Sequence, residues 1–184
     1  AYFAYFYPDT EKWTNAAGDD LGISIDEDEI NDCIVFNSGE LNSKYKHAVD
    51  YYFTASYTDD GQPILLYISR DKKGGRLNSA SWTGSAWDLT QVSPIDAGSI
   101  PIEIERLGGD DFIAYQISGS QIISYKTVDG GKTWLFDHVI ETNISNLNKF
   151  GMIENYHQDI KFLGLQADWE ERDTSGVYGV YTIK

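Results

Sequence analysis

Residues 127–134 read Thr127-Val128-Asp129-Gly130-Gly131-Lys132-Thr133-Trp134, and they directly follow a run of residues typical of a β-strand. An aspartate in a turn accepts hydrogen bonds from nearby backbone N–H groups, and glycine adopts the positive φ that other residues resist. The stretch therefore predicts a β-hairpin turn with a fixed conformation, after which Trp134 returns the chain to the sheet.

Short strand-like segments, rich in tyrosine and interrupted by turn signals, fill the rest of the chain. No segment has the pattern of a long amphipathic helix. We expect strands at residues 2–7, 34–37, 51–57, 64–69, 77–82, 86–92, 100–107, 111–116, 121–127, 133–141, 152–155, 160–167 and 176–182. Many short strands joined by hairpins are typical of a sandwich, a barrel or a propeller.

The stretch 127–134 also resembles the Asp-box of the sialidase-type β-propellers, whose pattern is Ser or Thr, any residue, Asp, any residue, Gly, any residue, Thr, Trp. Every position of that pattern is matched. The resemblance implies an all-β propeller of four-stranded antiparallel blades. In that family the Asp-box lies on an outer hairpin of a blade, away from the ligand site. We therefore expect structural roles for Asp129, Gly131 and Trp134, and the fold does not itself fix the function.

An internal repeat supports the propeller and bears on its size. Residues 61–67 and 109–115 both contain a polar turn followed by an apolar strand that ends in tyrosine, and they lie 48 residues apart. A propeller blade takes roughly 40–50 residues. Residues 1–184 would then form one propeller domain, or part of one, with about four blades. Because rings of the sialidase type use more blades, we expect a partial ring that a second chain or a further segment completes.

A second, looser resemblance runs from His47 to Tyr181. Residues 45–50, 59–67 and 81–87 are similar to the repeat-containing propellers that include the polysaccharide lyases acting on ulvan and related uronate polymers. This resemblance implies a propeller that binds an acidic polysaccharide on one face and, in the lyases, cleaves it by β-elimination. With a polysaccharide as the partner, we expect a secreted or extracellular protein.

β-Elimination needs a group that neutralises the uronate carboxylate, a base for the C5 proton and an acid for the leaving oxygen. Arg70 is the candidate for the carboxylate, since its planar guanidinium matches carboxylate geometry. His47 and Tyr52 complete the candidate catalytic set. Tyr51 and His157 are the candidates for substrate binding.

Each of these candidates has a simpler alternative. Arg70 could pair with Asp71 on the surface, and the two histidines could be solvated loop residues. In a regular strand only one of two successive tyrosines can face a ligand. Three further tyrosines are expected to pack between blades: Tyr67, Tyr115 and Tyr125.

Two other functions stay open. A sialidase-like glycosidase would need three arginines on the carboxylate of its sugar, and the Arg-Ile-Pro motif that carries the first of them is not found in this sequence. A non-catalytic carbohydrate-binding propeller, or lectin, would stack exposed aromatic side chains on sugar rings. The discriminating feature is whether His47, Arg70 and a tyrosine meet in one cleft.

The charge of the chain limits its partners. It has 29 acidic and 14 basic residues, for a formal net charge of −15. Such a surface repels phosphate backbones, so we expect no nucleic-acid partner. No apolar run approaches the roughly 20 residues that span a bilayer, so we expect no membrane partner either.

No cofactor and no metal site are expected. A structural calcium among residues 26–32 is the alternative, because calcium takes several oxygen ligands, although the segment lacks the glycine of a calcium-binding loop. The single cysteine, Cys33, excludes an internal disulfide, and we expect it to be a small buried residue at the start of a strand.

Overall fold

The computed structural model describes residues 1–36, 49–71, 74–93, 102–144, 147–157, 160–166 and 179–183. These residues form an all-β fold with one short 3-10 helix, η1 (Glu29–Cys33). In the described ranges, no helix is long and apolar enough to cross a membrane. The strands are β1 (Tyr5–Tyr7), β2 (Lys12–Thr14), β3 (Asp20–Gly22), β4 (Val49–Tyr57), β5 (Pro63–Asp71), β6 (Gly74–Trp82), β7 (Trp87–Gln91), β8 (Ile102–Gly108), β9 (Asp111–Ser118), β10 (Gln121–Thr127), β11 (Leu135–Glu141), β12 (Leu147–His157), β13 (Ile160–Gln166) and β14 (Gly179–Ile183).

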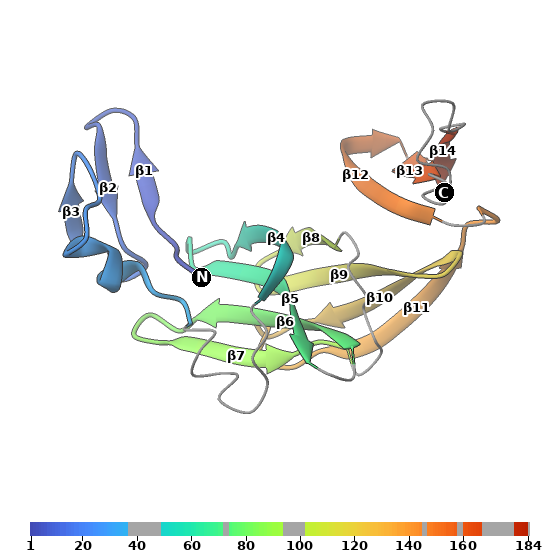
Figure 1. The fold of residues 1–184 in the computed structure, drawn as a ribbon, viewed down its shortest axis with the longest axis horizontal. Helices are drawn as coiled ribbons and strands as arrows, with labels where there is room; N and C mark the ends of the chain where they lie inside the picture. Colours follow the sequence, from blue (N-terminus) through green and yellow to red (C-terminus); the bar gives the residue numbers. More distant parts are fainter. Residues whose placement is uncertain are drawn as a thin grey trace.

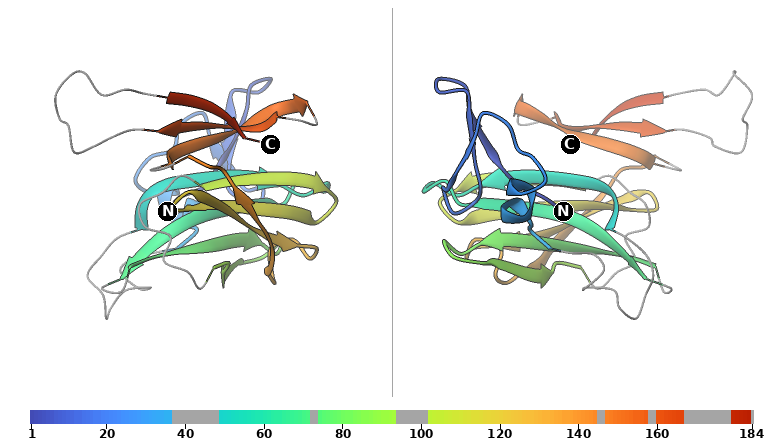
Figure 2. Two further views of the ribbon diagram at one scale, coloured as in Figure 1. Left: turned by 90° about the vertical axis from the view of Figure 1, so that its right-hand side faces the viewer. Right: turned by 60° about the vertical axis from the view of Figure 1, so that its left-hand side comes forward.

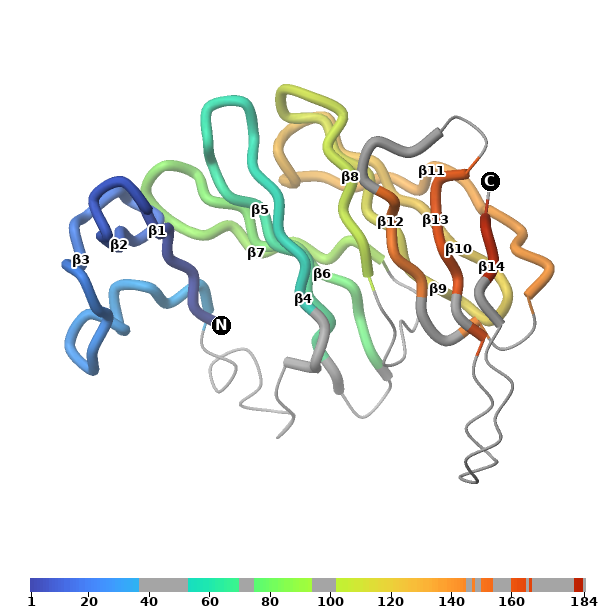
Figure 3. The backbone as a smooth tube through the Cα atoms, turned by 90° about the horizontal axis from the view of Figure 1, so that it is seen from above, coloured from blue at the N-terminus to red at the C-terminus, as the bar shows by residue number. Residues whose placement is uncertain are grey.

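The strands form four antiparallel sheets, each built from strands that are consecutive in the chain. Two sheets have four strands, in the orders β4-β5-β6-β7 and β8-β9-β10-β11, and two have three, β1-β2-β3 and β12-β13-β14. Figure 3 shows the sheets following one another in chain order, from blue to red. The first strands of the last three sheets are neighbours, with β4 beside β8 and β8 beside β12. This is the arrangement of a partial β-propeller with about four blades.

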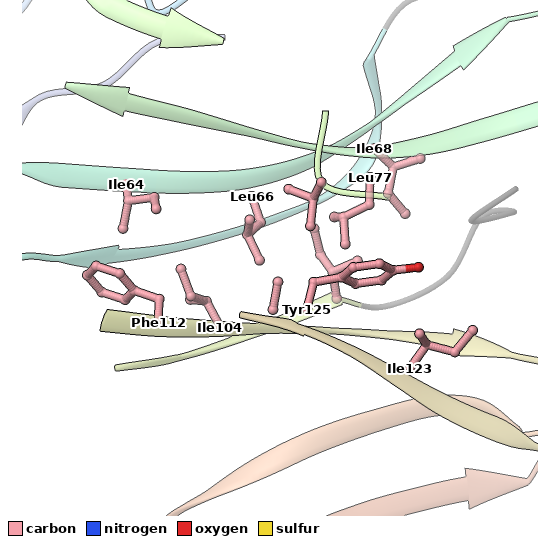
Figure 4. Packing of buried hydrophobic residues seen from close by; sticks show 11 residues of the cluster. Ile64, Leu66, Ile68, Leu77, Ile104, Phe112, Ile123 and Tyr125 are labelled. Atoms are coloured by element: carbon pink, nitrogen blue, oxygen red, sulfur yellow. The ribbon is translucent and has the colours of Figure 1, made fainter. Parts of the chain in front are cut away.

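Two buried cores lie between successive sheets, and another lies between the β4–β7 sheet and the N-terminal segment. Ile64, Leu66 and Ile68 of β5 point toward Phe112 and other residues of the β8–β11 sheet (Figure 4). The alternate residues of β5, Leu65 and Tyr67, pack on the opposite side with Val35 and Phe36 of the N-terminal segment. A strand buried on both faces reads as a continuous apolar run, which is why residues 63–68 are predictable as a strand.

The third core joins the β8–β11 sheet to the C-terminal sheet. Tyr115 and Ile117 of β9 pack there with Phe150 of β12 and Phe162 of β13. Tyr67, Tyr115 and Tyr125 are each buried in one of the three cores, which confirms that they pack between sheets. The small N-terminal sheet and the C-terminal sheet flank the two central sheets (Figures 1 and 2).

The N-terminal region differs from the sequence-based expectation. Strands β2 and β3 are not among the expected strands. Of the expected strand 34–37, the described residues 34–36 do not form a strand: Ile34 makes a single bridge with Tyr2. Cys33 is buried, but it ends η1 rather than starting a strand. The cause is local, because the carboxylates of Asp26 and Glu29 accept hydrogen bonds from backbone N–H groups and fold this acidic segment into a helical turn.

Candidate functional site

Four hairpin turns of the two central sheets, β4–β5, β6–β7, β8–β9 and β10–β11, gather at one end of the strands, which we name the turn end. Successive turns of an antiparallel sheet alternate between its two ends, so the β4–β5 and β6–β7 turns share an end, as do the β8–β9 and β10–β11 turns. Contacts between the sheets show that these two ends coincide. The backbone N–H of Gly109 donates to Asp59 Oδ2 at 2.9 Å, and Arg106 forms an ion pair with the same carboxylate. The opposite end, where β4 begins and β5 finishes, is the far end.

The β10–β11 turn at the turn end is held by the Asp129 carboxylate. Its Oδ1 accepts hydrogen bonds from Thr127 Oγ1 at 2.7 Å and from the backbone N–H of Thr133 at 2.9 Å, and its Oδ2 accepts from Thr133 Oγ1 at 2.6 Å. Partial burial raises the pKa of Asp129, but these hydrogen bonds outweigh it and leave the pKa below its usual value. Asp129 is therefore occupied within the turn.

Trp134 and Gly131 fasten this turn to the neighbouring sheet. Trp134 Nε1 donates to Ser79 Oγ at 2.9 Å and to the carbonyl of Gly131 at 3.1 Å, and the indole packs against the core between the sheets. Gly131 has a φ of +88°, and a Cβ there would lie 2.5 Å from Ile64 Cδ1 and from Ser81 Oγ. No other residue fits this position without displacing its neighbours.

A cleft of about 190 Å³ opens between the two central sheets at the turn end. The β4–β5 turn contributes Asp60 and Gln62, and the β8–β9 turn contributes Asp110. The end of β6 contributes Ser81 and Trp82, and Lys132 closes the cleft from the β10–β11 turn. The sequence identifies Asp60 and Asp110 only as turn residues, because nothing in one chain segment shows that turns 50 residues apart meet.

The far end holds most of the residues predicted to act on a polysaccharide. Arg70 lies near the end of β5, directly after Ser69, which pairs with Val49 at the start of β4. Between Val49 and Phe53 the register shifts, so three residues of β4, including Tyr51 and Tyr52, oppose only Ile68 of β5. The backbones of Tyr51, Tyr52 and Arg70 are thus brought together at one end of one hairpin. The register shift is a correction to the expectation of a regular alternating strand there.

The two candidate histidines differ in position. His47 lies outside the described residues. His157 is the last residue of β12, in another sheet. A register shift follows Met152, and His157 pairs with Ile160 at the start of β13, so it belongs to the C-terminal sheet. Its backbone therefore does not join those of Tyr51, Tyr52 and Arg70.

The third histidine belongs to a structural cluster. His138 Nδ1 lies 2.9 Å from Ser124 Oγ and 2.5 Å from Asp137 Oδ2, at a register shift in the β10–β11 pairing. A Ser-His-Asp relay uses the two different ring nitrogens, one for each partner. Here both partners contact the same nitrogen, and Ser124 is fully buried, so the cluster is suited to holding the bulge and not to nucleophilic catalysis.

The described residues contain no group of three or more His, Cys, Asp or Glu side chains placed to hold a metal ion. In the segment proposed as a calcium alternative, Asp26 Oδ1 accepts the backbone N–H of Asp28 at 2.9 Å and Glu29 Oε2 accepts that of Asp26 at 3.0 Å. The calcium alternative has no support from this geometry.

Comparisons with known proteins give a distant likeness in structure. No protein-family model matches the chain, and no curated protein matches it. Among solved structures, the chain is similar to an alpha-L-arabinofuranosidase from Fusarium graminearum, determined as a mutant with an iminosugar inhibitor. The two are 12% identical with a TM-score of 0.45, and the match covers 75% of this chain and 46% of that one. The chain therefore spans less than half the length of that enzyme.

Proposed function

We propose that this chain is part of a carbohydrate-active propeller that binds a uronate-containing polysaccharide at the far end and cleaves it by β-elimination. The observation that carries the proposal is the register shift in β4, which places Tyr51 and Tyr52 beside the end of β5 and Arg70. Bulges of this kind occur next to active sites, where they redirect side chains away from regular alternation. The hydrogen bonds around Asp129 support a kinship with the Asp-box propellers as part of the same proposal.

The proposed reaction assigns one task to each residue. The Arg70 guanidinium binds the uronate carboxylate and offsets the negative charge that develops when C5 loses its proton. His47 or Tyr52 removes that proton, the C5–H electron pair forms the C4=C5 double bond, and the C4–O bond breaks. The other of the two protonates the leaving oxygen. Tyr51 supports a sugar ring, and His157, which lies in another sheet, takes no part in the proton transfers.

The alternative is a lectin that binds the polymer without cleaving it. His157 lies in another sheet from Tyr51, Tyr52 and Arg70, and this favours the alternative, because binding does not require all the candidate residues to meet at one reacting bond. A sialidase-like site needs three arginines on one carboxylate. Arg106 lies at the turn end and pairs with Asp59, so such a site at the far end would need all three remaining arginines, Arg70, Arg76 and Arg172.

The test is the ultraviolet absorbance of the unsaturated uronate product, followed with a panel of alginate, pectate, ulvan and hyaluronan. We expect one of these polymers to yield product, and Arg70→Ala to reduce the rate by about 100-fold, as removal of a group that stabilises developing charge does. Arg106→Ala is the matched control, since it removes an arginine from the turn end and should leave the rate unchanged. Equal losses in both variants, or no product from any polymer, would contradict the lyase proposal.

A further inference from the structure

The cleft at the turn end contains an unsatisfied polar group that the proposed polysaccharide site does not use. Ser81 is only 5% exposed, and its Oγ has no hydrogen-bond partner in the described structure. It lines the cleft together with Asp60, Asp110 and Trp82. A buried hydroxyl without a partner is costly, so a native protein that keeps one commonly satisfies it with a bound molecule.

The neighbouring serine on the same strand shows what a satisfied position looks like. Ser79 and Ser81 are two residues apart in β6, so both face the β8–β11 sheet. Ser79 Oγ donates to the carbonyl of Gly131 at 3.3 Å and accepts from Trp134 Nε1 at 2.9 Å. Ser81 has the same orientation but meets the cleft, where no protein group takes its hydrogen bond.

From these observations we infer that the cleft is a second binding site, which takes one neutral sugar unit of a glycan. The Ser81 hydroxyl would meet one sugar hydroxyl at the base of the cleft. In the described structure the Asp110 carboxylate makes no hydrogen bond or ion pair, so its oxygens are available to accept from further hydroxyls at the rim. Trp82 also lines the cleft, while its ring packs edge-on against Trp87, at a centroid distance of 5.4 Å.

The contents of the cleft select this class of ligand over others. Its volume of about 190 Å³ is below the range of drug-sized sites and suits a single ring. The described carboxylates do not form a metal-binding group, which argues against a divalent cation. Asp60, Asp110 and Asp129 repel an anionic uronate, while the single cation Lys132 lies among them. A neutral polyhydroxyl ring matches this mixture of acceptors and donors.

This inference does not rest on the proposed lyase or lectin activity, because the cleft and Arg70 lie at opposite ends of the β4–β5 hairpin. A polysaccharide that fails to bind at the far end leaves the inference intact. A neutral sugar that fails to bind in the cleft leaves the far-end proposal intact.

The experiment is ligand-observed NMR of the full chain with the methyl glycosides of glucose, galactose, mannose and arabinose, followed by titration to obtain Kd. We expect one glycoside to bind with a Kd in the millimolar range, as a single small ring does. Ser81→Ala and Asp110→Asn should each weaken binding by about tenfold. Ser81→Ala breaks no hydrogen bond of the free protein, so its thermal stability should not fall, which keeps the result interpretable.

Two matched controls separate the cleft from its surroundings. Thr54→Ala removes a hydroxyl outside the cleft in the same sheet, and Arg70→Ala alters the far end; both should leave the Kd unchanged. Binding that survives both Ser81→Ala and Asp110→Asn would overturn the inference, as would binding of none of the glycosides. Binding of lysine methyl ester or calcium chloride in place of every sugar, lost in Asp110→Asn, would also overturn it by identifying a cation site.

Discussion

At the scale of single residues, the two glycines of the β10–β11 turn offer a matched comparison. Both have positive φ, but a Cβ on Gly131 would lie 2.5 Å from Ile64 Cδ1 and Ser81 Oγ, whereas a Cβ on Gly130 would come no closer than 3.9 Å to Asp110 Cγ. We expect Gly130→Ala to lower the free energy of unfolding by about 1–2 kcal/mol, from backbone strain alone. Gly131→Ala should cost about 1–3 kcal/mol more, from overpacking. Urea unfolding of the two variants measures the difference, and equal losses would show that the close contact relaxes freely.

Gln116 provides a second test at this scale. It is fully buried in β9, and within the described structure neither its Nε2 nor its Oε1 has a hydrogen-bond partner. Gln116→Met keeps the shape of the side chain and removes the buried amide, so we expect the free energy of unfolding to rise by about 1–2 kcal/mol. Ser124→Ala is the contrasting change, because Ser124 is equally buried but hydrogen-bonded to Asp137, and it should destabilise the protein. A loss of stability in Gln116→Met would mean that the amide is satisfied in solution.

At the scale of elements, the β10–β11 hairpin should make stability depend on pH. The pKa of Asp129 is lower in the folded state than its ordinary value. The hairpin is therefore stabilised at pH values above the unfolded pKa of about 3.9, and this contribution is lost as the pH falls through the folded pKa. We expect Asp129→Asn to lower the free energy of unfolding by roughly 1–3 kcal/mol at neutral pH and by much less in acid.

Thermal unfolding of both proteins between neutral pH and acid measures this difference. Asp88→Asn, which changes an exposed carboxylate in β7, is the control, and its stability should depend on pH in the same way as that of the unaltered chain. If the free energy of unfolding of Asp129→Asn lay below that of the unaltered chain by the same amount at every pH, the effect could not be assigned to the carboxylate.

The elements also show what the sequence can predict. Strands β5, β9 and β10 are buried on both faces, so their apolar runs identify them directly, and the tyrosines that end the repeated segments mark the cores between sheets. Strands β2 and β3 have three residues each, too few to show any periodicity. The shift in β4 adds residues opposite Ile68, and a single strand carries no sign of such an insertion.

The candidate sites depend on contacts that sequence patterns cannot supply. Arg70 and Tyr52 lie on strands that the sequence predicts to be adjacent, so their approach could be anticipated. The presence of Ser81 and Asp110 in one cleft could not be anticipated. The two residues belong to different sheets, and the packing of Ile64 against Phe112 between those sheets sets how the sheets lie against each other. The position of His157 could not be anticipated either, because the sequence predicts only residues 152–155 of β12 and shows no sign of the register shift before His157.

At the scale of the whole molecule, one buried ion pair joins the C-terminal sheet to its neighbour. Lys161 Nζ lies 2.6 Å from Glu105 Oε2, and Tyr115 donates to the same oxygen at 2.5 Å. Glu105 is 7% exposed. Lys161→Met removes this cation from a buried carboxylate, so we expect a loss of about 3–5 kcal/mol in the free energy of unfolding. The double variant with Glu105→Gln should recover much of that loss, and a double variant no more stable than Lys161→Met alone would contradict the pairing.

The central claim is that the two ends of the central sheets bind different carbohydrates. The most direct test is isothermal titration calorimetry with two ligands. One is a uronate oligosaccharide from the polymer that the chain cleaves, and the other is the methyl glycoside that binds in the cleft. Each is titrated into the unaltered chain, Arg70→Ala and Ser81→Ala. We predict that Arg70→Ala loses the oligosaccharide and keeps the glycoside, and that Ser81→Ala does the reverse. Loss of both ligands in either variant, or retention of both in each, would contradict two separate sites.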